Sequence, residues 1–521
     1  MSRDLARGLA RGLKDAGVQR LFGMPGGGPN LDMIGAAEEL NIPFVLLHGE
    51  TAACIAAATY GRITGTPGVA LVTRGPGLTS AANGLAQATL DRFPLLLISD
   101  AVSEADAGRV AHQRLDQVAM ARPLTKWSGT LGTGNPSALG EAAARLSLEP
   151  PAGAVYLAFD PTVAGASPPT FVAPMVAEPA QLARARELIA GAARPIIIIG
   201  VDAVPQAEEI RTALKNLDCP LLVTYEATGV VPTSWSTYAG IFTGAAIERP
   251  LIARADLVVG IGLDSVEPMP GPWDREVPMI LFHRHAVETT YFGAPLLVVG
   301  EYAEHLPRLL EDAHPTWSTG YGKTTRQANL ELIECSTSGL SPLDVVRATQ
   351  QQLGSTLLTV DAGAHMLVAM PLWETDEPNA TQISNGLATM GFSLPAAVGT
   401  ALANPGRRVV CFTGDGGLGM VLSELETLAR LRLDVTVVVF NDAALTLIEL
   451  KQGALQGGRD AVRYGPIDFA AAATAMGVPG LVVEDVSGLR KALDSDTVGP
   501  HLIDARVDAA AYRHVIAAIR G

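Results

Sequence analysis

The feature that most constrains the fold is the alternation of short apolar runs with segments rich in alanine and glycine. Runs as apolar as the one at 195–200 are typical of strands buried on both faces, and the segments at 51–64 and 79–91 are typical of helices. This alternation predicts parallel sheets covered by helices on both faces. The expected strands occupy residues 20–24, 43–48, 68–73, 93–99, 154–159, 195–200, 220–225, 256–260, 278–282, 295–299, 357–360, 408–413, 434–440 and 501–505.

Two irregular stretches divide this pattern. Residues 160–180 are rich in proline and residues 316–328 are polar, and we expect both to be linkers between domains. At roughly 150 residues per domain, a chain of 521 residues has room for three or four domains. We predict three consecutive α/β domains, each a doubly wound parallel sheet, at residues 1–165, 178–315 and 335–521.

The net charge of the chain argues against two classes of binding partner. The chain has 38 Lys and Arg against 53 Asp and Glu, a formal net charge of −15 at pH 7. Such a charge repels nucleic acid and anionic lipid, so we expect neither as a partner. No apolar run reaches the ~20 residues of a membrane-spanning helix, and the first residues lack the apolar centre of a signal peptide. We therefore expect a cytoplasmic protein that acts on small molecules.

Composition and cysteine usage favour a globular enzyme. Hydrophobic residues make up 48% of the chain, enough for several packed cores, and charged residues, at 17%, are too few for a disordered chain or a coiled coil. The cysteines lie too far apart in the sequence for a disulfide framework or a clustered metal site. They are Cys54, Cys219, Cys335 and Cys411.

A glycine-rich turn in the last third carries the strongest chemical signal. The segment TGDGG at 413–417 follows the apolar run at 409–412 and precedes a helical pattern. A turn of this kind presents free backbone N–H groups where a phosphate can bind. Asp415, at the carboxyl end of the expected strand, is an oxygen ligand suited to Mg²⁺ or Ca²⁺.

A second acidic residue follows the next strand. The run at 435–440 ends at Asn441-Asp442, with 24 residues between Gly416 and Asn441. Because neighbouring parallel strands end at the same edge of a sheet, this strand–helix–strand unit is expected to bring Asp415 and Asp442 together. Two oxygen ligands beside a phosphate-binding turn favour a metal–diphosphate site. The alternative is that both segments are ordinary turns.

With these motifs the chain resembles the thiamine diphosphate-dependent enzymes of the acetolactate synthase, pyruvate oxidase and pyruvate decarboxylase group. The resemblance implies that Asp415, Asp442 and the carbonyl of Ala444 are ligands of Mg²⁺. The family more often has Asn in place of Asp442, and we expect the added charge to be tolerated because the metal partly neutralises it. The resemblance also implies cofactor contacts from Gly414, Gly416, Gly417 and Leu445.

A further match lies in the first third of the chain, in the segment LLHGETAA at 46–53. Glu50 stands where the family has a glutamate that hydrogen-bonds N1′ of the aminopyrimidine and so promotes removal of the proton from thiazolium C2. This role requires an acid in an apolar pocket, where desolvation raises its pKa. Without the family, Glu50 would be an acid at a helix N-terminus that the helix dipole favours.

The segment SNGLATMGFSLPAA at 384–397 is a third match. Met390 stands where the family has a large apolar residue that wedges under the cofactor, and the carbonyl of Ala388 would accept a hydrogen bond from the 4′-amino group. The alternative is a core methionine in a glycine-rich turn. Gly363 and His365 match another diphosphate contact of the family, although a lone histidine is equally compatible with a structural role.

The segment FGMPGG at 22–27 matches the family's first strand and loop. The resemblance implies that Gly26 and Gly27 face the thiazolium of the partner subunit. In the resembling enzymes the domain that carries Glu50 meets the diphosphate motif across a subunit boundary. We therefore expect a homodimer or homotetramer.

The pair His112-Gln113 bears on the reaction type. It aligns with Phe-Gln in acetolactate synthases and with His-His in many 2-oxo acid decarboxylases, and the run at 118–127 beyond it resembles the carboligase branch. An imidazole can deliver a proton near neutral pH, and an amide can only donate a hydrogen bond to a carbonyl. Together with Glu50, both residues are candidate catalytic residues.

The middle third shows no signal for a bound nucleotide. Some resembling enzymes hold FAD in this domain, but the Asp-Arg that they place after the strand ending near Asp264 is absent, and no GxGxxG occurs. We expect no FAD, and a domain that serves as a spacer and an oligomer surface.

The resemblance implies an enzyme that depends on thiamine diphosphate and Mg²⁺ and acts on small carbonyl substrates. We predict an acetolactate synthase-like carboligase that decarboxylates a 2-oxo acid and joins it to a second carbonyl. The alternatives are a 2-oxo acid decarboxylase or C–C lyase, and a catalytically silent homologue. The presence of both Glu50 and Asp415 argues against the silent homologue.

Overall fold

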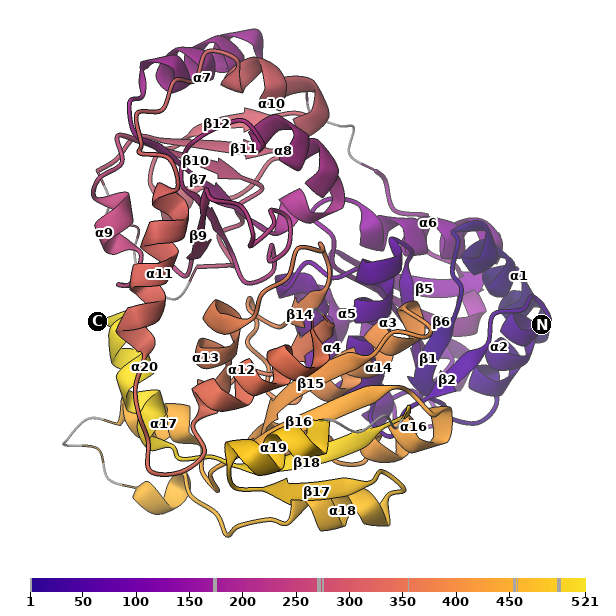
Figure 1. Ribbon diagram of the computed structural model, residues 1–521. Coiled ribbons are helices and arrows are strands. Elements are labelled where there is room, and N and C mark those ends of the chain that lie inside the picture. Colours follow the sequence, from indigo (N-terminus) through magenta and orange to yellow (C-terminus); the bar gives the residue numbers. More distant parts are fainter. Residues whose placement is uncertain are drawn as a thin grey trace.

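Three consecutive α/β domains, each built on a six-stranded parallel sheet, make up the chain (Figure 1). The computed structural model describes residues 2–171, 176–268, 273, 276–354, 356–452, 456, 458–493 and 498–521. The prediction of three doubly wound parallel-sheet domains is confirmed. Within these residues, no helix combines the length and the apolar character that crossing a membrane requires.

The first sheet has the strand order β2-β1-β3-β4-β6-β5. Its strands are β1 (Leu21–Met24), β2 (Phe44–Leu46), β3 (Gly68–Val72), β4 (Leu95–Asp100), β5 (Trp127–Thr133) and β6 (Ala154–Ala164). Its helices are α1 (Ser2–Asp15), α2 (Pro29–Glu38), α3 (Glu50–Thr64), α4 (Pro76–Leu90), α5 (Gln117–Ala121) and α6 (Pro136–Leu148). Helices α1, α2 and α6 share a core with one face of this sheet, and α3 and α4 pack on the other.

The third sheet repeats this topology. Its order, β14-β13-β15-β16-β18-β17, is the same sequence of positions as in the first sheet. The strands are β13 (Leu357–Val360), β14 (Thr381–Ile383), β15 (Val409–Gly414), β16 (Val435–Asn441), β17 (Gly480–Val483) and β18 (His501–Arg506). The helices are α12 (Pro342–Leu353), α13 (Ala364–Leu372), α14 (Ser393–Ala403), α15 (Asp415–Val421), α16 (Glu424–Leu431), α17 (Thr446–Lys451), α18 (Phe469–Ala475), α19 (Val486–Leu493) and α20 (Ala510–Arg520).

The first and third sheets share a hydrophobic core through α3 and α14. Small residues make this close packing possible: a Cβ added to Gly399 of α14 would lie 2.4 Å from the carbonyl oxygen of Ala56 in α3. The left-handed Gly65, with φ of 67°, ends α3. One continuous cluster of buried side chains runs from β3 and β4 of the first domain, through α3 and α14, to β15 and β16 of the third domain.

The middle sheet has a different order, β12-β11-β10-β7-β8-β9. Counted along the chain, this is the 3-2-1-4-5-6 order of doubly wound folds, which reverses between β7 and β10. The strands are β7 (Pro195–Ile199), β8 (Leu221–Val223), β9 (Tyr238–Ile241), β10 (Leu257–Ile261), β11 (Met279–His283) and β12 (Leu296–Val299). The helices are α7 (Pro179–Gly191), α8 (Ala207–Leu214), α9 (Arg249–Ile252), α10 (Tyr302–Leu310) and α11 (Tyr321–Ile333).

The structure shortens the first expected linker, because the described residues between β6 and α7 (165–171 and 176–178) form no helix or strand, and it corrects the second. Strand β6 continues to Ala164, so an ordered strand occupies the start of the stretch at 160–180, of which residues 172–175 lie outside the described part of the chain. The polar stretch at 316–328 is not a linker for most of its length, because α11 begins at Tyr321 after the left-handed Gly320. Trp317 is also anchored, since its indole donates to the carbonyl of Pro195 at 2.8 Å.

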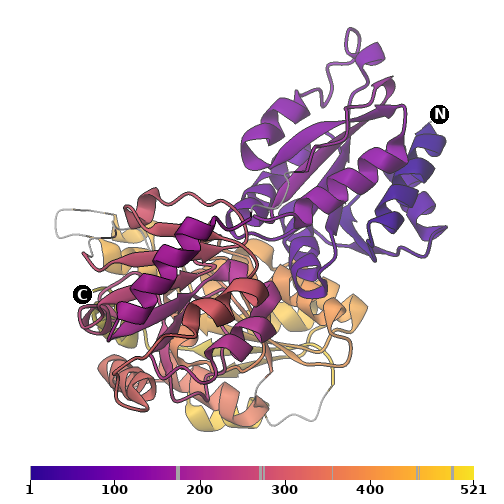
Figure 2. The same cartoon turned by 90° about the horizontal axis from the view of Figure 1, so that it is seen from above.

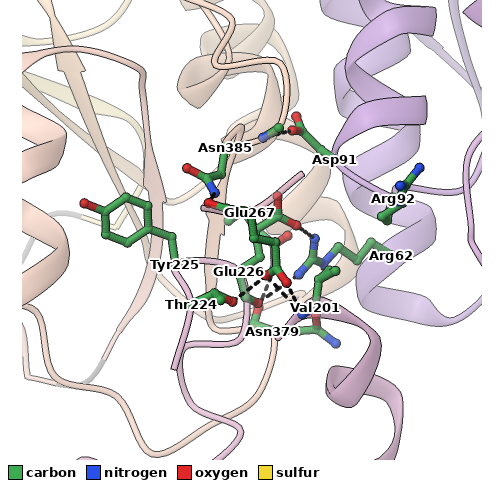
Figure 3. A network of polar contacts seen from close by, with 12 residues as sticks. Arg62, Asp91, Arg92, Val201, Thr224, Tyr225, Glu226, Glu267, Asn379 and Asn385 are labelled. Carbon is green, nitrogen blue, oxygen red and sulfur yellow. Dashed lines mark hydrogen bonds and ion pairs between the residues drawn. The ribbon is translucent and has the colours of Figure 1, made fainter. Parts of the chain in front are cut away.

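Buried polar contacts join the three domains at one point (Figure 3). Arg62, at the end of α3, donates to the buried carboxylate of Glu226 at 2.5 Å. The carboxylate of Glu267 accepts from the backbone N–H of Val201 at 3.0 Å, and the Glu267 carbonyl accepts from Asn385 of the third domain at 2.6 Å. Seen from above, the first domain lies to one side of the other two, and this junction ties it to them (Figure 2).

Candidate cofactor-binding site

A cavity of about 350 Å³ opens at the carboxyl edge of the third sheet. The strand order reverses there between β13 and β15, and in open α/β sheets the crevice at such a reversal is the usual ligand site. The loops after β13, β15 and β16 all line the cavity, including Gly363, Asp415 and Asp442. The edge that the sequence predicted for Asp415 and Asp442 is therefore the edge that carries this cavity.

Three hydrogen bonds hold the Asp415 carboxylate in place. Its Oδ1 accepts from the Gly416 N–H and from the Tyr464 hydroxyl, both at 2.7 Å, and its Oδ2 accepts from the Ala443 N–H at 2.7 Å. Ala443 has a φ of 57°, a left-handed conformation that places its N–H toward the neighbouring loop. The carboxylate thus bridges the loops after β15 and β16.

The Asp442 carboxylate lies beside Asp415, and neither forms an ion pair with a described cation, although Lys451 and Arg520 line the same cavity. Its Oδ2 accepts from the Thr446 hydroxyl at 2.5 Å. Burial, together with the Asp415 carboxylate, raises the pKa of Asp442 to about 6, and burial also raises the pKa of Asp415. A divalent cation between the two carboxylates would relieve this repulsion. Oxygen ligands of this kind fit Mg²⁺, and the carbonyl of Ala444 lies in the same cavity wall.

The turn beneath these carboxylates accepts only glycine. A Cβ on Gly416 would lie 2.8 Å from Cδ2 of Leu445 and 3.3 Å from Cε of Met390, and one on Gly417 would lie 2.0 Å from Oδ2 of Asp361. Met390 and Leu445 therefore lie directly over the turn, at the cavity wall. The bare backbone of the turn leaves the space at the strand end open to a ligand.

His365 contributes a buried polar atom that has no partner. Its ring stacks on Phe440 with centroids 5.3 Å apart, and its Nε2 makes no hydrogen bond to any described residue. Burial lowers the pKa of His365 to about 3, so the ring is neutral and carries a single N–H, for which the backbone carbonyl of Asp361 is an acceptor. The buried Nε2 without a partner is free to contact a ligand that enters the cavity.

Sequence reasoning missed Asp361, Thr446 and Tyr464, which hydrogen-bond groups of this site. Asp361 is fully buried and accepts from the backbone N–H groups of Gly391 and Phe392 at 3.0 and 3.1 Å. It thereby ties the Met390 turn to β13, and its position just after an apolar run was a usable signal. Tyr464, which donates to Asp415, comes from a loop 49 residues away in sequence and left no such signal.

The remaining predicted site residues gather at the same edge of the first sheet. Glu50 begins α3 after β2, and Gly26 follows β1. Gln113 packs against Gly75, which follows β3, because a Cβ added to Gly75 would lie 3.0 Å from the Cβ of Gln113. His112 beside Gln113 is exposed. The Glu50 side chain is half-buried and has no hydrogen-bond partner in the described part of the chain. Gly27 lies in the same loop as Gly26.

Within one chain, the structure does not bring the predicted site residues of the first domain together with those of the third domain. The first-sheet residues do not line the cavity of about 350 Å³ as the described residues define it. Ala388, with φ of 54°, and Met390 do line it. The loop before Glu50 instead contacts α16, where the Glu424 carboxylate accepts from the His48 N–H at 3.0 Å.

Comparisons with known proteins identify related sequences for each domain. Residues 3–120 match the N-terminal TPP binding domain of thiamine pyrophosphate enzymes, residues 182–304 the central domain, and residues 361–505 the C-terminal TPP binding domain. The chain is 30% identical to a catabolic acetolactate synthase of Raoultella terrigena, over 95% of this chain and 93% of the relative. It is 28% identical to an acetolactate synthase of Bacillus subtilis (strain 168), over 95% and 92%.

Proposed function

This chain belongs to the thiamine pyrophosphate enzyme family, and from that premise we propose that it is an acetolactate synthase-like carboligase that requires thiamine diphosphate and Mg²⁺. In this proposal it decarboxylates a 2-oxo acid and joins the remaining fragment to a second carbonyl compound. The observation that carries the proposal is the cavity where Asp415, Asp442 and the unpartnered Nε2 of His365 converge.

The residues of the third domain would hold the cofactor and its metal. Asp415, Asp442 and the Ala444 carbonyl would ligate Mg²⁺, and His365 would contact the diphosphate. Met390 would support the rings of the cofactor from below. When bound, thiamine diphosphate supplies a thiazolium carbon that adds to the carbonyl of the substrate and accepts the electrons left by carbon dioxide.

Glu50 would act from the first domain of a second copy of the chain. Its carboxylate has no hydrogen-bond partner in the described part of its own chain, which supports a role toward a group that another chain holds. A carboxylic acid enclosed there exchanges a proton with the aminopyrimidine. We therefore infer a homodimer, or a dimer of dimers, whose sites lie between subunits.

The pair at 112–113 bears on the choice between ligation and simple decarboxylation. Gln113 is half-buried, with its Cβ and backbone close to Gly75, and its amide would be able to hydrogen-bond an acceptor carbonyl. His112 is exposed and is the imidazole of the pair that can protonate carbon at neutral pH. With a single imidazole in this pair, ligation is favoured over release of the aldehyde.

The test follows carbon dioxide and ligation product together. Purified protein with thiamine diphosphate, Mg²⁺ and a panel of 2-oxo acids, with and without an acceptor, should form more ligation product than free aldehyde when the acceptor is present. His112→Phe should lower aldehyde release more than ligation, and the exposed control His314→Phe should change neither. Aldehyde as the main product in the presence of acceptor would favour the decarboxylase. Cofactor binding without turnover of any 2-oxo acid would favour the silent homologue.

A further inference from the structure

A second cavity, of about 530 Å³, lies between the middle and first domains. It lies where the order of the middle sheet reverses between β7 and β10, the position at which doubly wound sheets bind ligands. Asp202, Arg284 and His285 line it from the middle domain. It shares no lining residue with the cavity at Asp415 within the described part of the chain.

Two imidazoles and one carboxylate converge at the wall of this second cavity. Nδ1 of His283 lies 3.9 Å from Oδ2 of Asp202, and Nδ1 of His285 lies 3.7 Å from Oδ1 of Asp202. The ligand atoms that the three residues offer all lie within 4.8 Å of one another. The residues come from two strand ends, because Asp202 follows β7 while His283 ends β11 and His285 follows it.

The imidazole atoms that face Asp202 have no other partner. Nε2 of His283 lies 2.9 Å from the Leu263 carbonyl and donates to it, so the neutral ring presents a lone pair at Nδ1. Neither ring nitrogen of His285 has a hydrogen-bond partner among the described residues. His283 is 1% exposed, and burial lowers the pKa of both histidines, which keeps the rings uncharged. The His283 lone pair that faces a carboxylate in a buried place is unfavourable unless a cation lies between them.

Hydrogen bonds from neighbouring residues orient the His283 ring and the Asp202 carboxylate, as hydrogen bonds to the ligands of a metal centre do. Metal-binding histidines usually donate their second N–H to a carbonyl or a carboxylate, as His283 does to Leu263. Oδ1 of Asp202 accepts from Arg284 at 2.6 Å, and Oδ2 accepts from the Tyr302 hydroxyl at 2.7 Å and, at 3.3 and 3.4 Å, from the backbone N–H and Nε of Arg284. A carboxylate oxygen has about two lone-pair positions, so Oδ1 keeps one for a metal. Asp264 is engaged by Arg92 at 2.8 Å and is not needed as a ligand.

We propose that Asp202, His283 and His285 bind a divalent metal ion of the Zn²⁺ type. Two imidazole nitrogens and one carboxylate oxygen are a ligand set suited to Zn²⁺ and its neighbours in the transition series rather than to Mg²⁺. Ligand atoms around a tetrahedral Zn²⁺ lie roughly 3.3 Å apart, so the two distances from the imidazoles to Asp202 would each contract by about half an ångström on binding. A fourth position remains open to the cavity. The Arg284 guanidinium lowers the affinity for a dication and favours an anionic oxygen at that position.

The experiment uses untagged full-length protein, stripped with a chelator and then saturated with thiamine diphosphate and Mg²⁺. Zn²⁺ is titrated in competition with a chromophoric chelator. We expect one tight Zn²⁺ per chain. His285→Gln should weaken it at least about 100-fold, because loss of a group that only orients a ligand already costs roughly 10–100-fold. His285 makes no hydrogen bond to a described residue, so this variant removes a ligand without breaking one.

Three controls separate this site from other binding. His314→Gln, at an exposed histidine, should leave the Zn²⁺ affinity unchanged. Asp415→Ala should also bind Zn²⁺ as tightly as the unchanged chain, so failure of the proposed cofactor site does not affect the result. With Cu²⁺ as the probe, electron paramagnetic resonance should show nitrogen coupling that His285→Gln reduces. Absence of tight Zn²⁺ binding, equal binding by His285→Gln, or loss of binding in Asp415→Ala would each overturn the proposal.

Discussion

The first and third domains have the same strand order but different carboxyl edges. At the reversal point of the third sheet, the buried carboxylates of Asp415 and Asp442 and an orphaned His365 line a cavity. At the carboxyl edge of the first sheet, Glu50 follows the edge strand β2, is only half-buried and has no partner among the described residues. The two sheets therefore have carboxyl edges of the same topology but with different side chains. Those of the third sheet suit the binding of an anion and a metal, and those of the first sheet supply acid–base groups.

This difference also indicates what each edge lacks. The third edge has carboxylates whose charges repel each other, which a cation would balance. The first edge has an acid that lines neither of the two cavities formed by the described residues at Asp415 and Asp202, although proton exchange requires an apolar enclosure. The carboxyl edges of the first and third sheets therefore complement each other, and substitutions can test each edge separately.

The largest effect is expected from the first edge. Glu50→Gln keeps the size of the side chain but removes the exchangeable acid, so exchange of the C2 proton of thiamine diphosphate should slow by roughly 10²–10⁴-fold. Proton NMR after acid quench measures this rate, and calorimetry should show that the cofactor still binds. Glu38→Gln, at an exposed acid of the same domain, is the matched control and should exchange at the normal rate. Normal exchange in Glu50→Gln would remove the first edge from the chemistry.

The third edge should respond in binding rather than in proton exchange. Asp415→Ala removes a proposed metal ligand and leaves the Ala443 N–H without its partner, so thiamine diphosphate at fixed Mg²⁺ should bind at least about 100-fold more weakly. Isothermal titration calorimetry measures the change. Glu484→Ala, at an exposed acid of the same domain, should bind normally. Equal affinity for Asp415→Ala and the unchanged chain would contradict the assignment of the metal.

A smaller effect sharpens the description of the third edge. Tyr464→Phe removes the hydroxyl that orients the Asp415 carboxylate, and loss of such a group costs roughly 10–100-fold in metal affinity. The Mg²⁺ concentration for half-maximal activity should rise accordingly, and saturating Mg²⁺ should restore the rate. A lower rate that saturating Mg²⁺ does not restore would mean that Tyr464 acts on the substrate instead.

The smallest effect concerns the junction between the domains. Burial raises the pKa of Glu267 to about 8 in the folded state, above the roughly 4.3 of an unfolded chain. The folded protein therefore binds this proton more tightly, and its stability should fall by about 1.4 kcal/mol per pH unit between these values. The Glu267→Gln variant has no titratable group at this position. Its thermal midpoint should fall less between pH 6 and pH 8 than that of the unchanged chain, and parallel curves would contradict the raised pKa.

The alternation of apolar runs was sufficient to predict the three domains and most strands, but it did not reveal β5, β9, β14 and β17. All four are edge strands of their sheets. β5 (WSGTLGT) and β14 (TQI) contain polar residues, and β9 and β17 are only four residues long and partly exposed, so none of them is a long buried apolar run. Helix α11 was missed for a related reason, because its buried residues are only Gly322 and Ile333 and its composition is therefore polar.

Within the site, the sequence predicted what neighbouring strand ends bring together. Asp415 and Asp442 follow adjacent parallel strands, so their proximity follows from the strand–helix–strand unit. The support from Tyr464 and the convergence of Asp202 with His283 depend on segments far apart in sequence, which meet only through the packing of the domain. No spacing rule applies to contacts of that kind.

The most direct test of the complementary edges is to mix two inactive variants. If each active site combines the first domain of one chain with the third domain of another, a dimer of one Glu50→Gln and one Asp415→Ala chain contains one intact site. Random exchange of equal amounts of the two variants should then restore about a quarter of the normal activity. Activity that stays at the level of the separate variants after verified subunit exchange would show that both edges must belong to the same chain, and would contradict the account.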